Sequence, residues 1–361
     1  MKLFTVGPVA CRPEVLREMS TQMFSHRSAE YVELHNDTVR RLQKFLETKN
    51  QIFLLPSSST GMMEASIRNC VRKKVLCCVN GEFGRRFSQV AKANGKVVVD
   101  LEIPLGEPIT PEALDEALRK NPDVEAVTIV YSETSTGLLN PLRELAKVAA
   151  EHGKMVLVDA VSAMGGVELK IDEWGIDVCF AGSQKCFGVP PGLTVGVVSQ
   201  RALEASEKME NKGWYFDFKI YEKYNQRGNT PTTPPIPQIA ALRKELEIIE
   251  EEGGKRARLA LYRKRFERIV QGVKEMGLSL FPRAGYESPT VACVNAPPGM
   301  TGHEVYERMR ERGFEIARGY RQLGERTFRI GNMGYITFDE IDEMLMALAE
   351  VVTQSKRPPA Q

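Results

Sequence analysis

The sequence has almost no net charge, because 49 lysine and arginine residues stand against 47 aspartate and glutamate residues. Such a balance argues against nucleic acid or an anionic membrane as the main partner. Long apolar runs are missing too, since none reaches the roughly 18 residues needed to cross a bilayer. The first residues, 1–8, lack the apolar core and small-residue cleavage site of a secretory signal, so we expect none.

Metal-binding patterns are also absent. The four histidines are scattered, and the seven cysteines show no paired ligand spacing. An odd number of cysteines without such spacing is typical of reduced thiols inside a cell. Cys77 and Cys78 lie in an apolar run and are expected to pack in the core. The sequence therefore predicts no metal site and a cytoplasmic location.

What the chain does have is length and apolar content. Its 361 residues, 42% of them hydrophobic, allow a large core and about two domains. Apolar strand-like runs alternate with helical patterns, which predicts an α/β fold with a mostly parallel sheet covered by helices on both faces. We predict an N-terminal segment (1–20), a large domain (21–252) and a smaller C-terminal α+β domain (253–361) that ends in a disordered tail (355–361).

The alternating segments can be placed along the chain. The predicted strands are 52–55, 75–79, 96–101, 126–131, 155–159, 178–181 and 193–198, then 290–295 and 328–330 in the smaller domain. The predicted helices include 31–47, 62–72, 83–93, 111–119, 141–151, 236–251, 255–276, 302–312 and 338–352. Residues 209–237 break this rhythm with aromatics and prolines, which is typical of core or of an oligomer contact.

Lys185 stands alone just after the predicted strand 178–181. The Gly182-Ser183 pair ends that strand, so Lys185 would lie at the rim of the sheet, where α/β proteins bind ligands. Desolvation there lowers the pKa of a lysine and frees the neutral amine that condenses with an aldehyde. Taken alone, however, the same lysine could be a solvated surface charge, the usual place for this residue type.

Asp159 ends the predicted strand 155–159, which is 185 − 159 = 26 residues before Lys185. That spacing suits one strand–connection–strand step, so both side chains could reach the same cleft. An aspartate there can hold the pyridine nitrogen of pyridoxal phosphate protonated. A capping or turn aspartate is the alternative.

Small hydroxyl residues and glycine, 57–61, precede the predicted helix 62–72. The free amide groups and positive dipole end of that helix would make an anion site suited to a phosphate. A serine or threonine N-cap without a ligand explains the same letters equally well.

Several motifs in order make the chain resemble the class V aminotransferases, which are fold-type-I pyridoxal-phosphate enzymes. The resemblance runs nearly end to end and is closest to the alanine–glyoxylate and serine–pyruvate aminotransferase group. The matching motifs are Gly7-Pro8, Ser25-His-Arg-Ser28, Ser58-Ser-Thr-Gly-Met-Met-Glu64-Ala, Asn80-Gly-Glu-Phe83-Gly, Ser132-Glu-Thr-Ser-Thr-Gly137, Asp159-Ala-Val-Ser, Gly182-Ser-Gln-Lys185, Thr232-Thr-Pro-Pro235 and Phe328-Arg329-Ile-Gly331. This resemblance implies a homodimer with shared active sites and a ping-pong transfer of the amino group of alanine or serine to glyoxylate or pyruvate.

The resemblance also implies roles for single residues. Lys185 would carry pyridoxal 5'-phosphate and shuttle a proton, Asp159 would face the ring nitrogen, and Arg329 would grip the substrate α-carboxylate. The implied cofactor-binding residues are Ser59, Thr60, Gly61, Phe83, Thr134, Asp159, Gln184 and Lys185, with Thr230 and Thr233 from the partner subunit. Many relatives have glycines where this chain has Ser57-Ser-Ser, so the assignment of Ser59 is weaker than that of Thr60.

Other functions remain open at this point. A preference for aspartate or 2-oxoglutarate would need a second cation, because an unpaired buried carboxylate is costly; Arg27, Arg318 and Arg321 are candidates. A cysteine desulfurase needs a mobile cysteine, whereas Cys293 lies in a predicted strand and residues 313–324 contain none. Aminoethylphosphonate transaminases are similar as well. A non-enzymatic regulator with this fold would usually have lost the lysine or gained a DNA-binding domain.

Overall fold

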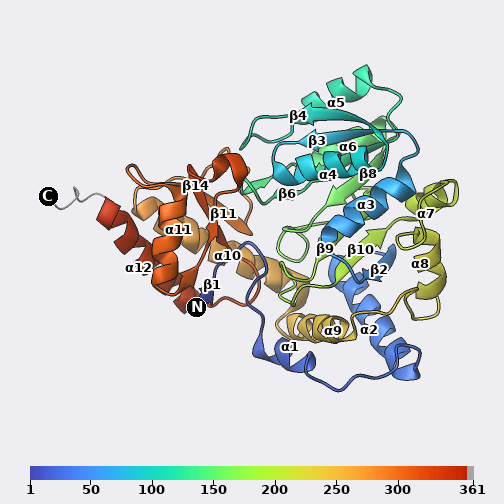
Figure 1. Cartoon of the computed structure of the whole chain (residues 1–361), viewed down its shortest axis with the longest axis horizontal. Coiled ribbons are helices and arrows are strands. Elements are labelled where there is room, and N and C mark those ends of the chain that lie inside the picture. The colour runs from blue at the N-terminus through green and yellow to red at the C-terminus, as the bar shows by residue number, and fades with distance from the viewer. Residues whose placement is uncertain (356–361) are drawn as a thin grey trace.

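The computed structural model describes residues 1–355, which form a larger and a smaller lobe (Figure 1). The larger lobe is built on a seven-stranded sheet. In spatial order its strands are β2 (Gln51–Leu55), β10 (Thr194–Val198), β9 (Val178–Gly182), β8 (Met155–Asp159), β5 (Ala126–Val130), β3 (Lys74–Val79) and β4 (Val97–Glu102). Strand β10 runs antiparallel to both neighbours and the other adjacent pairs are parallel, so the predicted mostly parallel sheet is confirmed.

Helices cover both faces of this sheet. Successive residues of a strand point to opposite faces, and in β8 Val156 and Val158 join one apolar core while Met155 and Leu157 join the other. The helices on the first face are α2 (Ala29–Leu46), α5 (Pro111–Lys120), α6 (Leu142–Glu151) and α9 (Ile236–Glu251). Those on the second face are α3 (Ser59–Cys70), α4 (Glu82–Ala93), α7 (Gln200–Glu207) and α8 (Phe218–Asn225). Burial on both faces is why these strands read as continuous apolar runs.

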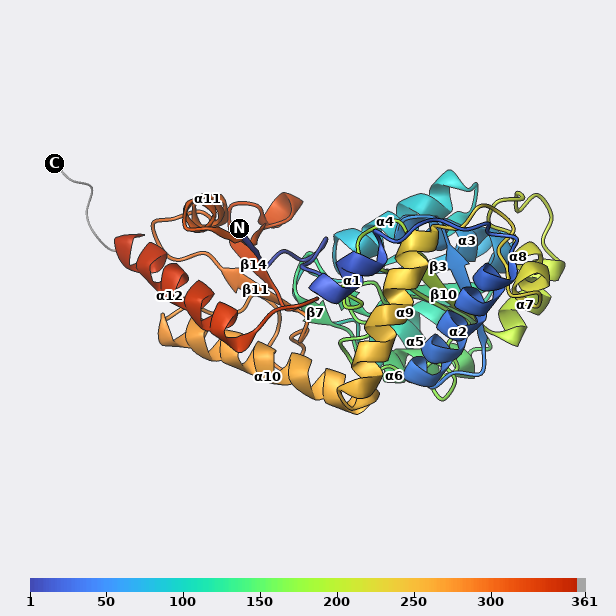
Figure 2. The ribbon, with the colours of Figure 1, turned by 90° about the horizontal axis from the view of Figure 1, so that it is seen from below.

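The smaller lobe has an antiparallel sheet with its own apolar core. The sheet consists of β11 (Val291–Asn295), β14 (Thr327–Gly331) and β13 (Ala317–Arg318). Around it lie α10 (Gly254–Glu275), α11 (Gly302–Glu311), the short 3-10 helix η1 (Arg321–Leu323) and α12 (Phe338–Ser355). Helix α10 starts beside the larger lobe and ends in the smaller one (Figure 2).

The N-terminal segment joins both lobes. Strand β1 (Lys2–Leu3) pairs with β12 (Phe314–Glu315), and Phe4 lies in the core of the smaller lobe. Helix α1 (Pro13–Glu18) instead packs against α9 of the larger lobe. The residues between them therefore cross from one lobe to the other.

Some elements differ from the predicted ones. Helix α3 begins at Ser59 rather than at residue 62, so Ser59, Thr60 and Gly61 form its first turn. Helix α8 lies within 209–237, where we predicted no helix; it begins where the Asp217 carboxylate accepts a hydrogen bond from the Lys219 N–H at 2.8 Å. Ser355 ends α12, and the rest of the predicted tail, 356–361, lies outside the described residues.

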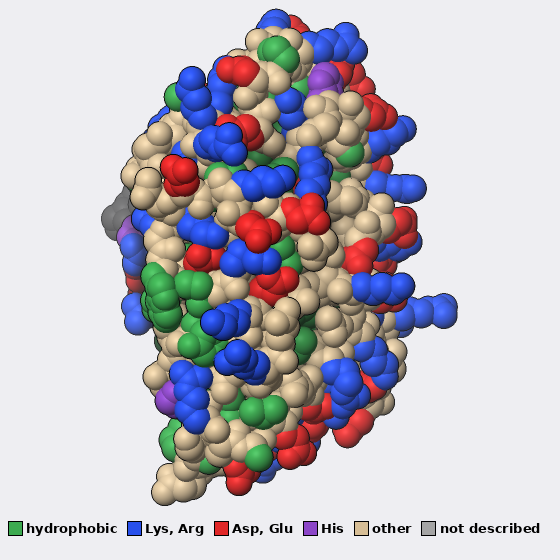
Figure 3. All heavy atoms as spheres, turned by 90° about the vertical axis from the view of Figure 1, so that its right-hand side faces the viewer, with side chains coloured by type: hydrophobic (Ala, Val, Ile, Leu, Met, Phe, Trp, Pro, Cys, Tyr) green, Lys and Arg blue, Asp and Glu red, His purple; other side chains and the backbone are tan. Residues whose placement is uncertain are grey.

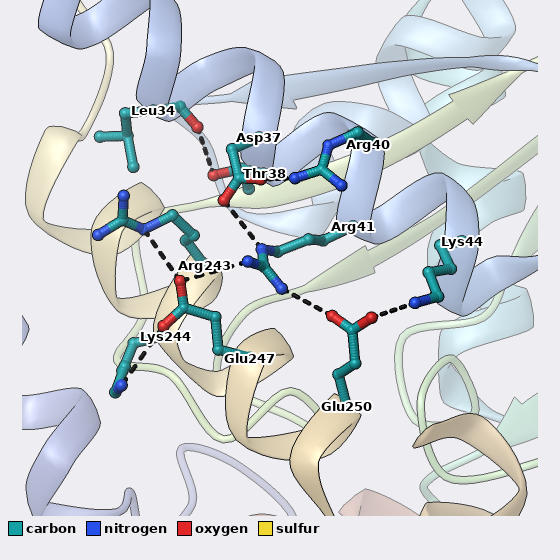
Figure 4. Close-up of polar contacts among 10 residues, drawn as sticks. All are labelled: Leu34, Asp37, Thr38, Arg40, Arg41, Lys44, Arg243, Lys244, Glu247 and Glu250. Carbon is teal, nitrogen blue, oxygen red and sulfur yellow. Dashed lines mark hydrogen bonds and ion pairs between the residues drawn. The ribbon is translucent and has the colours of Figure 1, made fainter. Parts of the chain in front are cut away.

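Charged side chains of both signs are mixed over the face that carries α7 and α8 (Figure 3). An ion pair also bridges α2 and α9, where Arg41 lies 2.7 Å from Glu250, and Arg41 lies 2.9 Å from Asp37 of its own helix (Figure 4). Such exposed pairs contribute only about 0–1 kcal/mol each, so apolar burial is what holds the two helices. Within residues 1–355, no helix combines the length and apolar character that spanning a lipid bilayer requires.

Candidate active site

The residues predicted to carry chemistry meet at one edge of the large sheet. Asp159 is the last residue of β8, in register with Val130 of β5 and Phe180 of β9. Lys185 follows β9 after a short turn, and residues 132–135 follow β5. The carboxyl ends of parallel strands open on the same edge of a sheet, which is where α/β proteins bind ligands. Chain topology alone therefore brings these three segments together.

The amine of Lys185 is buried, with 8% of the residue exposed, and donates a hydrogen bond to the backbone oxygen of Val6. Burial lowers the Lys185 pKa from 10.5 to about 8, and the positive charge of Arg329 acts in the same direction. Gly7 makes room for this side chain, because a Cβ there would lie 2.6 Å from Lys185 Cδ and 2.8 Å from Nζ. Near pH 8, about half of the Lys185 amines are then in the neutral form that attacks a carbonyl.

Asp159 is a buried carboxylate without a cationic partner. Its Oδ1 atom accepts a hydrogen bond from the backbone N–H of Val161 at 2.8 Å. Burial raises the Asp159 pKa to about 7, with a smaller contribution from the charge of Glu133. Asp159 forms no ion pair with any described residue. A ligand with a protonated ring nitrogen would supply the missing positive charge.

Arg329, on β14, brings a guanidinium from the smaller lobe. Its Nε and Nη2 groups donate to the carbonyl oxygen of Arg318 at 2.9 and 2.8 Å, and its Nη1 group donates to the carbonyl oxygen of Thr134 at 3.0 Å. Both acceptors are neutral, and burial lowers the Arg329 pKa. A guanidinium has five N–H donors, so two remain for a ligand such as a carboxylate.

Unpartnered polar groups gather at the start of α3. Ser58 occupies the N-cap position without bonding the helix amides through its side chain, and the first turn contains no acidic residue. The hydroxyls of Ser57 and Ser59 are buried and have no hydrogen-bond partner. A Cβ on Gly182 would overlap the Ser59 hydroxyl and the Gln184 amide, so both groups converge over that glycine. Orphaned hydroxyls beside free helix amides fit a phosphate group.

Two further predicted residues lie close to this edge. Phe83, in the first turn of α4, stacks on Tyr320 with ring centroids 6.0 Å apart. The Arg86 guanidinium lies 4.9 Å from the centroid of the Phe83 ring and donates to the Tyr320 hydroxyl at 3.3 Å. The hydroxyls of Thr134 and Ser162 are 2.6 Å apart, which ties the connection after β5 to the one after β8.

Thr230 and Thr233 form no described hydrogen bond with the other predicted site residues. The buried Thr230 hydroxyl donates to the carbonyl oxygen of Thr232 at 2.8 Å, and Thr233 is exposed. Their placement in a partner's site stays a prediction.

Phe216, from the aromatic stretch 209–237, lies against the first turn of α3 in its own chain, where a Cβ on Gly61 would be 3.0 Å from the Phe216 ring. A cavity of about 1160 Å³ between α10 and the larger lobe holds none of these residues, so chemistry rather than cavity size identifies the site.

Sequence reasoning assigned no role to Glu133, Arg86, Tyr320 or the carbonyl of Val6. Glu133 had one signal, because it is the only acid in the hydroxyl-rich connection 132–140 directly after a predicted strand. Tyr320 and Val6 had none, since each comes from a distant segment and contacts the site only after the lobes have packed.

Comparisons with known proteins point to one enzyme family. The family model "Aminotransferase class-V" matches residues 14–344. An uncharacterized aminotransferase of Methanocaldococcus jannaschii is 36% identical over 92% of this chain and 87% of its own length. The serine–glyoxylate aminotransferase of Methylorubrum extorquens is 34% identical over 92% of this chain and 86% of its own. The crystal structure of an alanine–glyoxylate aminotransferase from Nostoc sp. superposes with a TM-score of 0.92 at 31% identity, covering 97% of this chain and 94% of that one.

Proposed function

The chain belongs to the class-V aminotransferase family, and from that premise we propose that it is a pyridoxal-phosphate enzyme that transfers the amino group of alanine or serine to glyoxylate or pyruvate. Both half-reactions of this ping-pong mechanism use the same site. The observation that carries the proposal is the convergence of an amine of lowered pKa, an unpaired buried carboxylate and a buried guanidinium at Lys185, Asp159 and Arg329.

The residues present fit pyridoxal phosphate. When bound, this cofactor supplies an electron sink for the charge that develops at the substrate α-carbon. Lys185 would hold it covalently; the other residues that would hold it are Asp159 at the ring nitrogen, Phe83 against the ring, Thr134 near the phenolic oxygen, and Ser59, Thr60, Gly61 and Gln184 at the phosphate. Once the substrate amine has displaced Lys185 from the cofactor, Lys185 Nζ would accept the proton from the substrate α-carbon and pass it to the cofactor carbon C4′.

The cations around the site support a small monocarboxylic donor. Arg329 is available for the α-carboxylate, whereas the arginines considered for a second carboxylate are engaged elsewhere. Arg318 lies 2.8 Å from Glu307 and Arg321 lies 3.3 Å from Glu82. Arg27 donates to the side chain of Asn229 and the carbonyl oxygen of Thr230. A dicarboxylate bound there would have to break one of these contacts.

One observation favours the aspartate or 2-oxoglutarate alternative. Arg86 forms no ion pair with a described acidic residue, and its charge acts on both Asp159 and Lys185. No such observation supports a cysteine desulfurase, which needs a mobile cysteine. Cys293 is fully buried in β11, and burial raises the pKa of its thiol to about 11.

A donor panel tests the proposal directly. Alanine, serine, aspartate and glutamate are each assayed against glyoxylate, pyruvate and 2-oxoglutarate. Alanine or serine with glyoxylate or pyruvate should give the highest kcat/KM, and Lys185→Ala should abolish turnover while remaining folded. If aspartate or glutamate exceeds alanine and serine by more than roughly tenfold, about 1.4 kcal/mol of transition-state preference, the small-donor assignment is wrong. Normal transamination by Lys185→Ala would overturn the assignment of that lysine.

We also place the enzyme in the cytoplasm. All seven cysteines are free, and six of them are buried as thiols. Free thiols are typical of a reducing compartment.

A further inference from the structure

Glu133 is a buried carboxyl group that takes no direct part in the proposed reaction. Its residue exposure is 0%, yet it forms no ion pair with any described cation. Four donors surround it instead. Oε2 accepts from the backbone N–H groups of Phe83 and Gly84, each at 3.1 Å. Oε1 accepts from the N–H and the hydroxyl of Ser135, at 3.1 and 2.5 Å. Burial raises the Glu133 pKa, and these hydrogen bonds from Ser135, Gly84 and Phe83 act in the opposite direction by stabilising the ionised form.

Two of these donors belong to the first turn of α4. The N–H groups there have no partner within the helix and lie at the positive end of its dipole, so a carboxylate stabilises them. The residue before the helix, Gly81, has no side chain to do so. A Cβ on Gly81 would overlap the Glu133 side chain. Glu133, which is 50 residues from Phe83 in the chain, thus accepts hydrogen bonds that an N-cap side chain usually accepts.

The residues beside Glu133 make segment 132–135 a junction between the parts of the site. The Thr134 hydroxyl contacts the hydroxyl of Ser162, which directly follows Val161, the residue whose N–H donates to Asp159. The Thr134 carbonyl oxygen accepts from Arg329. Glu133 therefore connects the start of α4 to a segment that is itself fixed to the end of β8 and to β14.

We propose that Glu133 is a positioning residue for transamination, which acts by fixing the backbone of Phe83 relative to Asp159, Lys185 and Arg329. The inference rests on the proposed function, since Phe83 matters only if its ring meets the cofactor. A purely structural Glu133 would stabilise α4 and affect folding alone. A positioning Glu133 also determines how tightly, and in which orientation, the cofactor is held.

Three variants separate these roles. Glu133→Ala removes the acceptor for the α4 amides of Phe83 and Gly84. Glu133→Gln removes the charge but keeps one carbonyl oxygen that can accept from Phe83 and Gly84. Ser135→Ala, the matched control, removes the hydroxyl that donates to Glu133 and accepts from the Glu82 N–H, and it leaves the bonds of Glu133 to Phe83 and Gly84 in place. For each we measure the Kd of the apoprotein for pyridoxal phosphate, the visible circular dichroism of the bound cofactor, kcat and KM for the donor, and the Tm of the apoprotein.

Glu133→Ala should raise the cofactor Kd by at least about tenfold, the factor expected for loss of hydrogen bonds to a charged group, and should change the visible dichroic band. Its kcat should fall by more than its KM rises. Glu133→Gln should recover the wild-type band and most of the affinity, and Ser135→Ala should match the wild type in both. If Glu133→Ala does not fold, Glu133→Asp replaces it, because its shorter side chain weakens the α4 bonds and should shift the band in the same way.

Two results would overturn the inference. The first is a folded Glu133→Ala variant, or the Glu133→Asp variant in its place, that keeps the wild-type dichroic band and cofactor affinity. The second is a Glu133→Gln variant that is as impaired as Glu133→Ala. A drop in Tm alone, with cofactor binding unchanged, would show a structural role only. Failure of the proposed function itself is distinguishable, since the wild-type protein would then bind no pyridoxal phosphate and show no visible band.

Discussion

At the scale of single residues, the site depends on buried charges that lack partners of opposite sign. Lys185, Asp159 and Arg329 are each less than a tenth exposed, and their contacts within the chain are mostly with neutral backbone groups. Burying a charge without a partner is costly, and the cost moves the pKa toward the neutral form. A bound ligand group of complementary charge therefore lowers the free energy of each of these buried residues more than it would lower that of an exposed residue.

The lowered pKa of Lys185 makes cofactor attachment depend on pH. A lysine whose pKa falls from 10.5 to about 8 is protonated below pH 8 and neutral above it. The rate at which apoprotein attaches pyridoxal phosphate should therefore rise with pH and level off above about 8. Stopped-flow growth of the visible absorbance measures this rate, and Lys185→Ala supplies the baseline. A rate that keeps rising toward 10.5 would show an unshifted lysine.

At the scale of elements, the start of α3 combines a free helix terminus with orphaned hydroxyls. Ser59 lies in the first turn with its hydroxyl buried and unpartnered, whereas Ser66, later in the same helix, donates to the carbonyl oxygen of Met63 at 2.8 Å. A buried hydroxyl without a partner costs free energy until a ligand satisfies it. The first turn of α3 is thus suited to binding rather than to stability.

Ser59→Ala should accordingly separate stability from binding. The apoprotein should be as stable as the wild type or up to about 1 kcal/mol more stable, while pyridoxal phosphate binds more weakly by about 1 kcal/mol, roughly fivefold in Kd. Thermal unfolding and cofactor titration measure the two quantities. Ser66→Ala is the matched control, because it should lower stability by about 1 kcal/mol and leave cofactor affinity unchanged. An unchanged affinity in Ser59→Ala would remove Ser59 from the phosphate site.

At the scale of the whole molecule, the site exists only where the two lobes meet. The larger lobe supplies Lys185 and Asp159, the smaller lobe supplies Arg329, and the N-terminal crossing segment covers the lysine with Val6 and Gly7. Near the same edge, Trp214 and Tyr215 are 56% and 41% exposed, next to Phe216 on the first turn of α3. Large exposed aromatic side chains of this kind mark interaction surfaces.

We expect this aromatic stretch to contact a second copy of the chain. Light scattering should then give twice the 40.4 kDa chain mass. Trp214→Asp should shift the protein toward monomer and weaken cofactor binding, because Thr230 and Thr233 are predicted to reach the partner's site. Met346→Asp, on the 67% exposed Met346 of α12, is the control and should leave the mass unchanged. A fully active monomer at assay concentration would contradict the shared-site prediction.

The sequence by itself determined the strands of the large sheet, most of the helices, and two polar residues at or just after strand ends. Residues 155–159 and 236–251 were predicted with the bounds of β8 and α9, because apolar periodicity directly records which faces are buried. Asp159 and Lys185 could be singled out because Asp159 ends one such strand and Lys185 comes shortly after another. The start of α3 was placed three residues late, since its serine, threonine and glycine carry no apolar period.

Only the tertiary structure decided which groups surround those residues. The contacts Val6–Lys185 and Thr134–Arg329 join positions 179 and 195 residues apart, and Glu133 reaches Phe83 across 50 residues. Local patterns of hydrophobicity and hydrogen-bonding capacity specify that a polar group needs a partner, but they do not specify the partner. That choice follows from how the lobes pack, and the same packing buries Lys185 and Asp159 deeply enough to shift their pKa values.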